Sequence, residues 1–322
     1  MKKANLQILI KILVSFFFLF LLLRKIDINS SIEALRKCEL PLAITAIAIL
    51  VSTSLALALR LFILLRSQSE SDKINYPNIL KLTMVGLFFN NFLPTGAGGD
   101  IAKAFFLVKG EEKKLLIGSS VLIDRFLGAL TVISMGAVSS WMIPGIPSRY
   151  RIFLSAALVF LFGIIFFFTN RKAAGILYSG SKKLLPGNFR EKLKTFYFTF
   201  SSYFSAKKAI SAALGVSLLT QIVSIIANCL LSLSLPGNTG AGLWSFFTYI
   251  PLIWTATLIP SLGGLGVREF TYVYFFSPYM GEGNSAALSI LVLLGIVIQS
   301  VIGGILLLFL KMPSAVKKNA PC

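Results

Sequence analysis

The sequence contains no histidine, and this absence removes a large part of enzyme chemistry. Without histidine there is no histidine general base, no Ser-His-Asp triad and no histidine metal site. The three cysteines, Cys38, Cys229 and Cys322, lie far apart and form no C-x-x-C pair, so thiolate zinc sites and dithiol redox motifs are also excluded. We therefore expect neither a cofactor nor a metal.

Charge is scarce as well. Charged residues make up 13% of the 322 residues, whereas about 25% is usual for soluble domains. Hydrophobic residues make up 56%, and the mean hydropathy is +0.83. Such a chain cannot cover its own core with polar surface and must be solvated by lipid. We expect an all-α, polytopic helical membrane protein that forms a single integral membrane domain over residues 1–322.

Runs of about 20 apolar residues predict six full membrane spans. They cover residues 6–23, 40–59, 115–141, 152–169, 209–235 and 286–310. The first run follows lysines, as in a signal peptide, but no small-residue cleavage site comes after it. We interpret it as an uncleaved helix in which Lys11 snorkels toward the membrane surface.

Two further apolar regions, residues 79–108 and 243–278, are broken by glycine. Non-helical backbone at membrane depth survives only where protein or a wet cavity satisfies its polar groups. The sequence therefore predicts two re-entrant hairpins, one in each half, inserted from opposite sides as parts of an inverted repeat with a substrate site between them. The alternative for each region is an ordinary tight turn between two helices.

The candidate substrate-binding residues come from these two breaks. They are Asn90, Asn91, Pro94, Gly96, Gly98, Gly99, Asp100 and Lys103 in the first and Pro260, Gly263, Gly264, Gly266, Arg268 and Glu269 in the second. A helix that begins just after each break would present its positive N-terminal end to a phosphate or carboxylate. We expect Asp100 to act as a helix cap. We expect Gly98 and Gly264 to need a positive φ or a close backbone approach.

Charged residues at membrane depth are costly and usually mark function. Asp100 and Lys103 are three apart and share a helix face. Asp124 and Arg125 lie inside residues 115–141 and join the candidate site; as neighbours they point about 100° apart, so each should pair with another helix. Arg268 has two open roles, which are to pair with Asp100 or Asp124, or to bind a phosphate through its planar fork.

Isolated polar residues in the apolar runs carry a weaker signal. We interpret Gln221, Asn228 and Gln299 as hydrogen-bonding groups between helices. All charged pairs at membrane depth remain open to a purely structural interpretation, in which an ion pair ties two helices together.

The net charge of +19 is distributed unevenly along the chain. If each hairpin returns to its own side, 22 of the 31 lysines and arginines face one side and six face the other. The positive-inside rule then predicts cytoplasmic N- and C-termini in the cell membrane, and it removes nucleic acid as a partner. Within the basic connector 171–208 an amphipathic, interfacial helix is expected. Its apolar residues are Phe189, Leu193, Phe196, Phe200 and Phe204.

Three strings, NNFLPTGAGGDIAKAFFL, SSVLIDRFLG and IPSLGGLGVREF, resemble the lysylphosphatidylglycerol synthase transmembrane-region family. This family includes the flippase portion of MprF-type proteins and stand-alone YbhN-like proteins. The resemblance implies a prokaryotic flippase for a phospholipid, with the motif positions falling on the candidate residues above. Lys103 stands where arginine is more frequent and Asp124 where glutamate is common. No segment is long enough for the soluble aminoacyltransferase-like domain, so we expect no synthase activity.

Three functions remain open from the sequence. The first is a flippase for a membrane lipid, namely an anionic or aminoacylated phospholipid or a lipid-linked sugar, with a separately encoded lipid-modifying enzyme as a further partner. The second is a small-solute transporter with the same architecture. The third is a membrane-embedded transferase that uses a lipid donor and needs Asp100, Asp124 or Glu269 as a base. The oligomeric state is left undetermined by the sequence.

Overall fold

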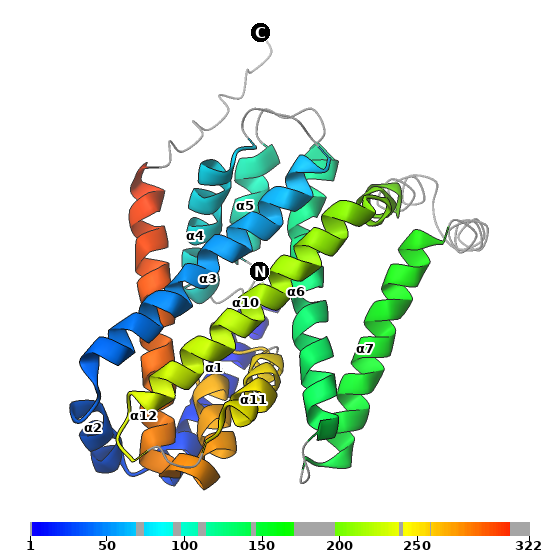
Figure 1. Ribbon diagram of the computed structural model, residues 1–322. Helices are drawn as coiled ribbons and strands as arrows, with labels where there is room; N and C mark the ends of the chain where they lie inside the picture. The colour runs from blue at the N-terminus through cyan, green and yellow to red at the C-terminus, as the bar shows by residue number, and fades with distance from the viewer. Residues whose placement is uncertain are drawn as a thin grey trace.

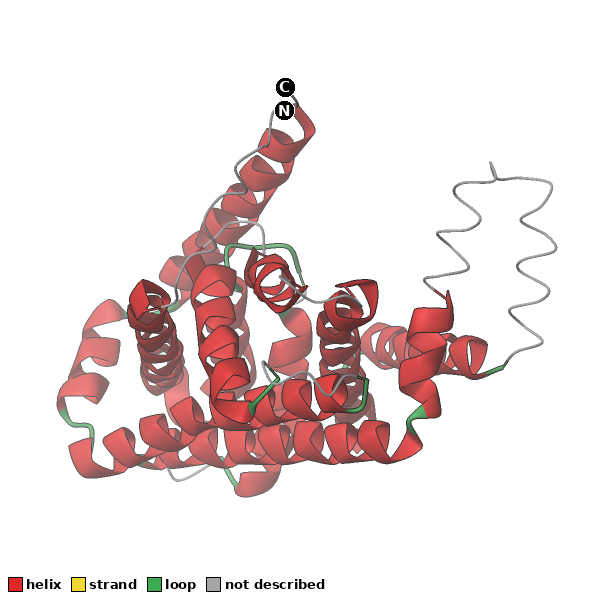
Figure 2. Cartoon of the chain, turned by 90° about the horizontal axis from the view of Figure 1, so that it is seen from above, coloured by secondary structure: helices red, strands yellow, loops and turns green. Residues whose placement is uncertain are grey.

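The computed structural model describes residues 2–68, 74–92, 98–108, 114–142, 146–170, 197–237, 241–257 and 259–309, which contain helices and no strands (Figures 1 and 2). The helices are α1 (Lys2–Lys25), α2 (Ile28–Arg36), α3 (Leu40–Arg66), α4 (Tyr76–Phe92), α5 (Gly98–Val108), α6 (Lys114–Met142), α7 (Ser148–Thr169), α10 (Lys207–Leu233), α11 (Leu243–Ala256) and α12 (Val267–Phe309). The protein is therefore a helical, multi-pass membrane protein, as predicted.

Five of these helices, α3, α6, α7, α10 and α12, are long and apolar enough to cross a membrane. Each matches one of the apolar runs, and α1 matches the remaining one. The number of crossings itself stays a prediction. One boundary differs, because α3 continues beyond residue 59 to Arg66 and so carries Arg60 inside a helix.

Both glycine-broken regions form pairs of short helices. α4 and α5 have 17 and 11 residues, so they measure about 26 and 17 Å at the usual helical rise, less than a bilayer core of roughly 30 Å. In Figure 1 they lie together at the upper end of the bundle, whereas α11 lies at the lower end. α11 is followed by a glycine turn and by the first part of α12, which ends where Gly281 breaks the helix with a φ of 78°.

Three helices of the first half begin 167 residues before their counterparts in the second half. The equivalent first residues are Leu40 and Lys207 for α3 and α10, Tyr76 and Leu243 for α4 and α11, and Lys114 and Gly281 for α6 and the second part of α12. α3 and α10 also have the same length, 27 residues. Residues 40–142 and 207–309 are thus two copies of one unit, made of a long helix, a broken hairpin and a second long helix.

The two copies are inverted relative to each other and interlock. α3 and α10 pack side by side and run in opposite directions. α6 and the second part of α12 also run in opposite directions, but they stand apart (Figure 1). The hairpin helix α4 packs on α12, which belongs to the second copy, and α11 packs on α6, which belongs to the first. Each hairpin is therefore held by the last helix of the other copy, which places the two hairpins on opposite sides of one centre.

The connector 171–208 differs from its prediction where it is described. Phe189, Leu193 and Phe196 lie outside the described residues. Residues 197–205 are helical, but Phe200 and Phe204 are buried against Phe168 of α7, with ring centroids 5.1 and 6.2 Å away. These two rings pack inside the protein because α6 and α7 offer them an aromatic cluster, so they do not face lipid headgroups.

Candidate functional site

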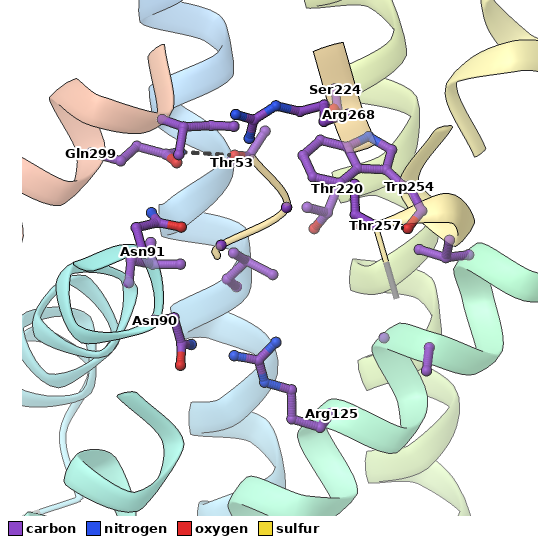
Figure 3. Close-up of a pocket in the computed structure, with 18 of the residues that line it drawn as sticks. Thr53, Asn90, Asn91, Arg125, Thr220, Ser224, Trp254, Thr257, Arg268 and Gln299 are labelled. Carbon is purple, nitrogen blue, oxygen red and sulfur yellow. Dashed lines mark hydrogen bonds between the residues drawn. The ribbon is translucent and has the colours of Figure 1, made fainter. Parts of the chain in front are cut away.

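A cavity of about 720 Å³ lies between the two copies of the repeat. Side chains of α1, α3, α4, α6, α10, α11 and α12 line it, together with the turn that follows α11 (Figure 3). The tips of the two hairpins meet at this cavity. A Cβ built on Gly263, in the second turn, would stand 3.2 Å from the carbonyl oxygen of Asn91, at the end of α4.

The lining follows the internal repeat. Six pairs of residues that are 167 positions apart both face the cavity. They are Thr53 and Thr220, Leu57 and Ser224, Leu87 and Trp254, Asn90 and Thr257, Ala129 and Ile296, and Val132 and Gln299. The cavity is therefore built around the pseudo-symmetry axis, and its two halves have the same backbone frame but different side chains.

An ion pair between α3 and α6 supports one wall. Arg60 Nε donates to Asp124 Oδ1 at 2.6 Å and Arg60 Nη2 to Asp124 Oδ2 at 3.0 Å, while Nη1 donates to Ser217 Oγ of α10 at 3.0 Å. Both charged side chains are less than a tenth exposed. The prediction that Asp124 pairs with another helix is confirmed, and its carboxylate is fully engaged in a bidentate pair.

The second charged cluster joins α5 to α6. Asp100 lies 3.0 Å from Lys103 Nζ on its own helix and 2.6 Å from Arg125 Nε on α6. The shared face of Asp100 and Lys103 and the inter-helix pairing of Arg125 are both confirmed. Arg125 reaches Asp100 through Nε, its side chain is half exposed, and its guanidinium points into the cavity (Figure 3).

The third cluster contains Arg268 and excludes one of the two roles left open for it. Arg268 pairs with neither Asp100 nor Asp124, because it donates through Nε and Nη2 to Oε1 of the adjacent Glu269, at 3.0 and 2.6 Å. The other oxygen, Glu269 Oε2, accepts the Gly266 N–H at 2.7 Å. This bond turns the carboxylate back over the first turn of α12, where the Arg268 side chain reaches it.

The glycines of the first break serve close packing. A Cβ on Gly99 would stand 1.8 Å from the carbonyl oxygen of Gly86, so α4 and α5 touch backbone to backbone. The prediction named Gly98 for a close approach or a positive φ, and it stays a prediction; the close approach shown here is that of its neighbour Gly99. The helix cap also differs, because the Gly99 N–H donates to Asn90 Oδ1 at 2.9 Å while Asp100 is engaged with cations.

The glycines of the second break allow a backbone conformation with positive φ. Gly263, Gly264 and Gly266 have φ values of 58°, 82° and 83°, in the region that residues with side chains rarely adopt. The positive φ expected for Gly264 is confirmed. α1 packs on this turn, since Ser15 Oγ accepts the Leu262 N–H at 2.9 Å.

The predicted site residues divide into three groups. Those that line the cavity are Asn90, Asn91, Arg125, Pro260, Gly263, Gly264 and Arg268. Those that support the lining from behind are Gly98, Gly99, Asp100, Lys103, Asp124, Gly266 and Glu269. Pro94 and Gly96 lie outside the described residues.

Sequence reasoning missed most of the lining residues, and three of them show why. Arg60 was counted as a cytoplasmic flanking charge because it follows an apolar run, and Lys11 was expected to snorkel to the surface, yet both line the cavity. Trp254 carried no signal, since a tryptophan in an apolar helix is unremarkable in sequence. A polar residue at an equivalent register in both halves, as for Thr53 and Thr220, is the sequence signal that could have pointed to the cavity.

The weaker polar residues mostly bridge helices, as predicted. Gln299 Nε2 donates to the Leu50 carbonyl at 3.0 Å and to Thr53 Oγ1 at 3.2 Å (Figure 3). Asn228 Oδ1 accepts from the Tyr272 hydroxyl on α12. Gln221 instead lines the cavity. In the described ranges, no group of three or more metal-ligating side chains comes together.

Comparison with known proteins gives a family match and one curated relative. A family model described as "Lysylphosphatidylglycerol synthase TM region" matches residues 8–306. The chain is similar to the UPF0104 membrane protein MJ1595 of Methanocaldococcus jannaschii, at 25% identity over 269 residues, which cover 76% of this chain and 78% of that protein. No solved structure matches.

Proposed function

We propose that this chain, which belongs to the lysylphosphatidylglycerol synthase transmembrane-region family, moves a phospholipid or lipid-linked substrate between the leaflets of the cell membrane. The observation that carries the proposal is the cavity at the meeting point of two inverted, broken hairpins, whose lining combines apolar side chains with four cations and several amides and hydroxyls. Such a cavity in a membrane protein is where transporters of inverted-repeat architecture bind their substrates.

The exterior of the bundle suits a substrate with acyl chains. Large apolar side chains are exposed on the outer helices, for example Phe160 on α7 at 69% and Ile152 at 65%. A lipid can leave its tails among such side chains while its headgroup enters the polar cavity.

The interlocked repeat supplies a plausible basis for movement. Because each hairpin packs on the last helix of the other copy, a shift of one copy against the other changes the surroundings of both hairpin tips together. Exchange of the conformations of two inverted copies opens a central site first to one side and then to the other.

A membrane-embedded transferase receives less support from the geometry. It requires a carboxylate that reaches the substrate as a general base. Asp100, Asp124 and Glu269 each pair with a cation, and no aspartate or glutamate is among the residues that line the cavity.

Reconstitution in liposomes tests the proposal. The purified chain is inserted into vesicles that contain an acyl-chain-labelled fluorescent phosphatidylglycerol, and dithionite bleaches the label in the outer leaflet. We expect vesicles with protein to lose nearly all fluorescence, whereas empty vesicles lose about half. Arg125→Gln should slow the exchange, and Arg66→Gln, which removes an exposed arginine at the end of α3, should not. Protection of half the label in the presence of folded protein would contradict the proposal.

A further inference from the structure

The charges around the cavity are unbalanced. Four cations, Lys11, Arg60, Arg125 and Arg268, are among the lining residues, and within the described part of the chain no carboxylate is. With Lys103 behind the wall, five cations accompany the three carboxylates of the ion-pair clusters. The described region around the cavity thus carries two more positive than negative charges, and the carboxylates are turned away from the open space.

Two of these arginines keep hydrogen-bonding capacity for a ligand. Arg125 engages Asp100 through Nε, and the end of its guanidinium points into the cavity (Figure 3). Arg268 engages Glu269 through Nε and Nη2, which leaves Nη1. Arg60 differs, because all three of its nitrogens are already used. Arg125 and Arg268 lie at opposite ends of the cavity in Figure 3, so an anion meets an arginine at either end.

Two buried hydrogen-bond donors also indicate a ligand that is rich in acceptors. The amide nitrogen Nδ2 of Asn90 and the indole nitrogen Nε1 of Trp254 are buried, line the cavity and have no hydrogen-bond partner among the described residues. Buried donors are normally satisfied, so an unpaired one in a cavity indicates a ligand or water that accepts. Both orphan groups are donors, as are the arginines, and a phosphate is rich in acceptors.

The hydroxyl groups of the cavity differ from these donors, because they can accept hydrogen bonds from a ligand. Thr220 and Thr257 donate their hydroxyl hydrogens to the carbonyls of Val216 and Trp254, at 2.7 Å each. Their oxygens therefore remain as acceptors on the cavity wall, and both side chains are drawn at its edge in Figure 3. Uncharged ligand hydroxyls, such as those of glycerol or a sugar, can donate to such oxygens.

From these observations we infer the substrate class of the proposed flippase: an anionic lipid whose phosphate bears an uncharged polyhydroxy group, and not an aminoacylated, cationic lipid. The inference rests on the proposed function. An aminoacyl headgroup carries ammonium groups, which would face arginines and donors with no carboxylate in reach. Like charges brought together out of water are strongly unfavourable, so the cavity selects against that headgroup.

The test compares two lipids that differ in the aminoacyl group. Acyl-chain-labelled phosphatidylglycerol and lysyl-phosphatidylglycerol are placed at equal mole fractions in separate liposomes with the purified full-length chain. We expect leaflet exchange of phosphatidylglycerol to be about tenfold faster or more. Trp254→Phe keeps an aromatic ring but removes the indole N–H together with the pyrrole part of the ring, and it should slow phosphatidylglycerol several-fold. The matched change Trp244→Phe, at an exposed position outside the cavity, makes the same loss of ring and donor and should have no effect. Lysyl-phosphatidylglycerol moving as fast or faster would overturn the inference.

A binding measurement separates failure of this inference from failure of the proposed function. In a variant with Trp141→Phe and Trp244→Phe, Trp254 is the remaining tryptophan, and its fluorescence reports occupancy in detergent. If no lipid moves but phosphatidylglycerol binds more tightly than lysyl-phosphatidylglycerol, the substrate class stands and the flippase proposal falls. Equal binding of the two lipids overturns the substrate class. Binding of soluble glycerol 3-phosphate as tight as that of phosphatidylglycerol overturns the lipid headgroup in favour of a soluble phosphate.

Discussion

Removal of one partner from the Arg60–Asp124 pair should destabilise the protein severely. The guanidinium places two nitrogens on the two carboxylate oxygens, at 2.6 and 3.0 Å, and both side chains are nearly inaccessible, at 7% and 6% exposure. Asp124→Leu would leave the guanidinium with Ser217 as its hydrogen-bond partner. Breaking a buried pair in this way costs about 3–5 kcal/mol, because the remaining charge is uncompensated.

The double variant distinguishes the pair from its parts. Arg60→Leu with Asp124→Leu removes both charges and keeps apolar volume, so it should recover most of the lost free energy of unfolding. The coupling energy of the cycle should be about 3 kcal/mol. Arg66→Leu, six residues further along α3 and exposed, is the matched control and should change stability by at most about 0.5 kcal/mol.

Unfolding in detergent micelles, driven by a denaturing detergent and followed by tryptophan fluorescence, measures these differences. The reasoning is refuted if either single variant loses less than about 1 kcal/mol, or if the double variant is no more stable than the worse single variant. The first result would mean that the pair is solvated, and the second that the cost lies in packing rather than charge.

Three further predictions follow from the contacts and the charge pattern. Gly99→Ala should cost about 1–3 kcal/mol of unfolding free energy in the same assay, because its Cβ would collide with the Gly86 carbonyl, whereas Gly163→Ala, which meets nothing within 4 Å, should be neutral or stabilising; equal effects would contradict the packing. Arg268→Lys keeps the positive charge beside Glu269 but loses the planar fork, so lipid exchange should fall about tenfold at normal abundance; wild-type exchange would remove Arg268 from the headgroup site. A reporter that is active only outside the cytoplasm, fused after Cys322, should be inactive; activity would invert the expected topology.

Much of the fold could be predicted because lipid imposes simple rules. Apolar runs of span length located the long helices, and glycine clusters inside such runs located both hairpins to within a few residues. The pairing of Asp124 and Arg125 with different helices was also predictable, since neighbouring residues diverge by about 100° and isolated charges are not tolerated in lipid.

The sequence could not predict which residues become partners in the folded protein. Arg60 was unrecognised because a cation at the end of an apolar run has the same sequence signature whether it faces the cytoplasm or a buried carboxylate. The pairing of Arg268 with its own neighbour depends on the Gly266 N–H that orients Glu269, a detail of one turn. The 167-residue register was hidden because equivalent positions have different chemistry, as at Asp100 and Val267.

The most direct test of the central claim is to fill the cavity from each copy of the repeat in turn. Ala129 and Ile296 are equivalent residues on its two sides, and a tryptophan at either position occupies space that a headgroup needs. If headgroups pass through this cavity, Ala129→Trp and Ile296→Trp should each abolish leaflet exchange in liposomes while the protein stays folded, and Gly163→Trp, on the open face of α7, should exchange lipid normally. Normal exchange by both cavity variants would contradict the account.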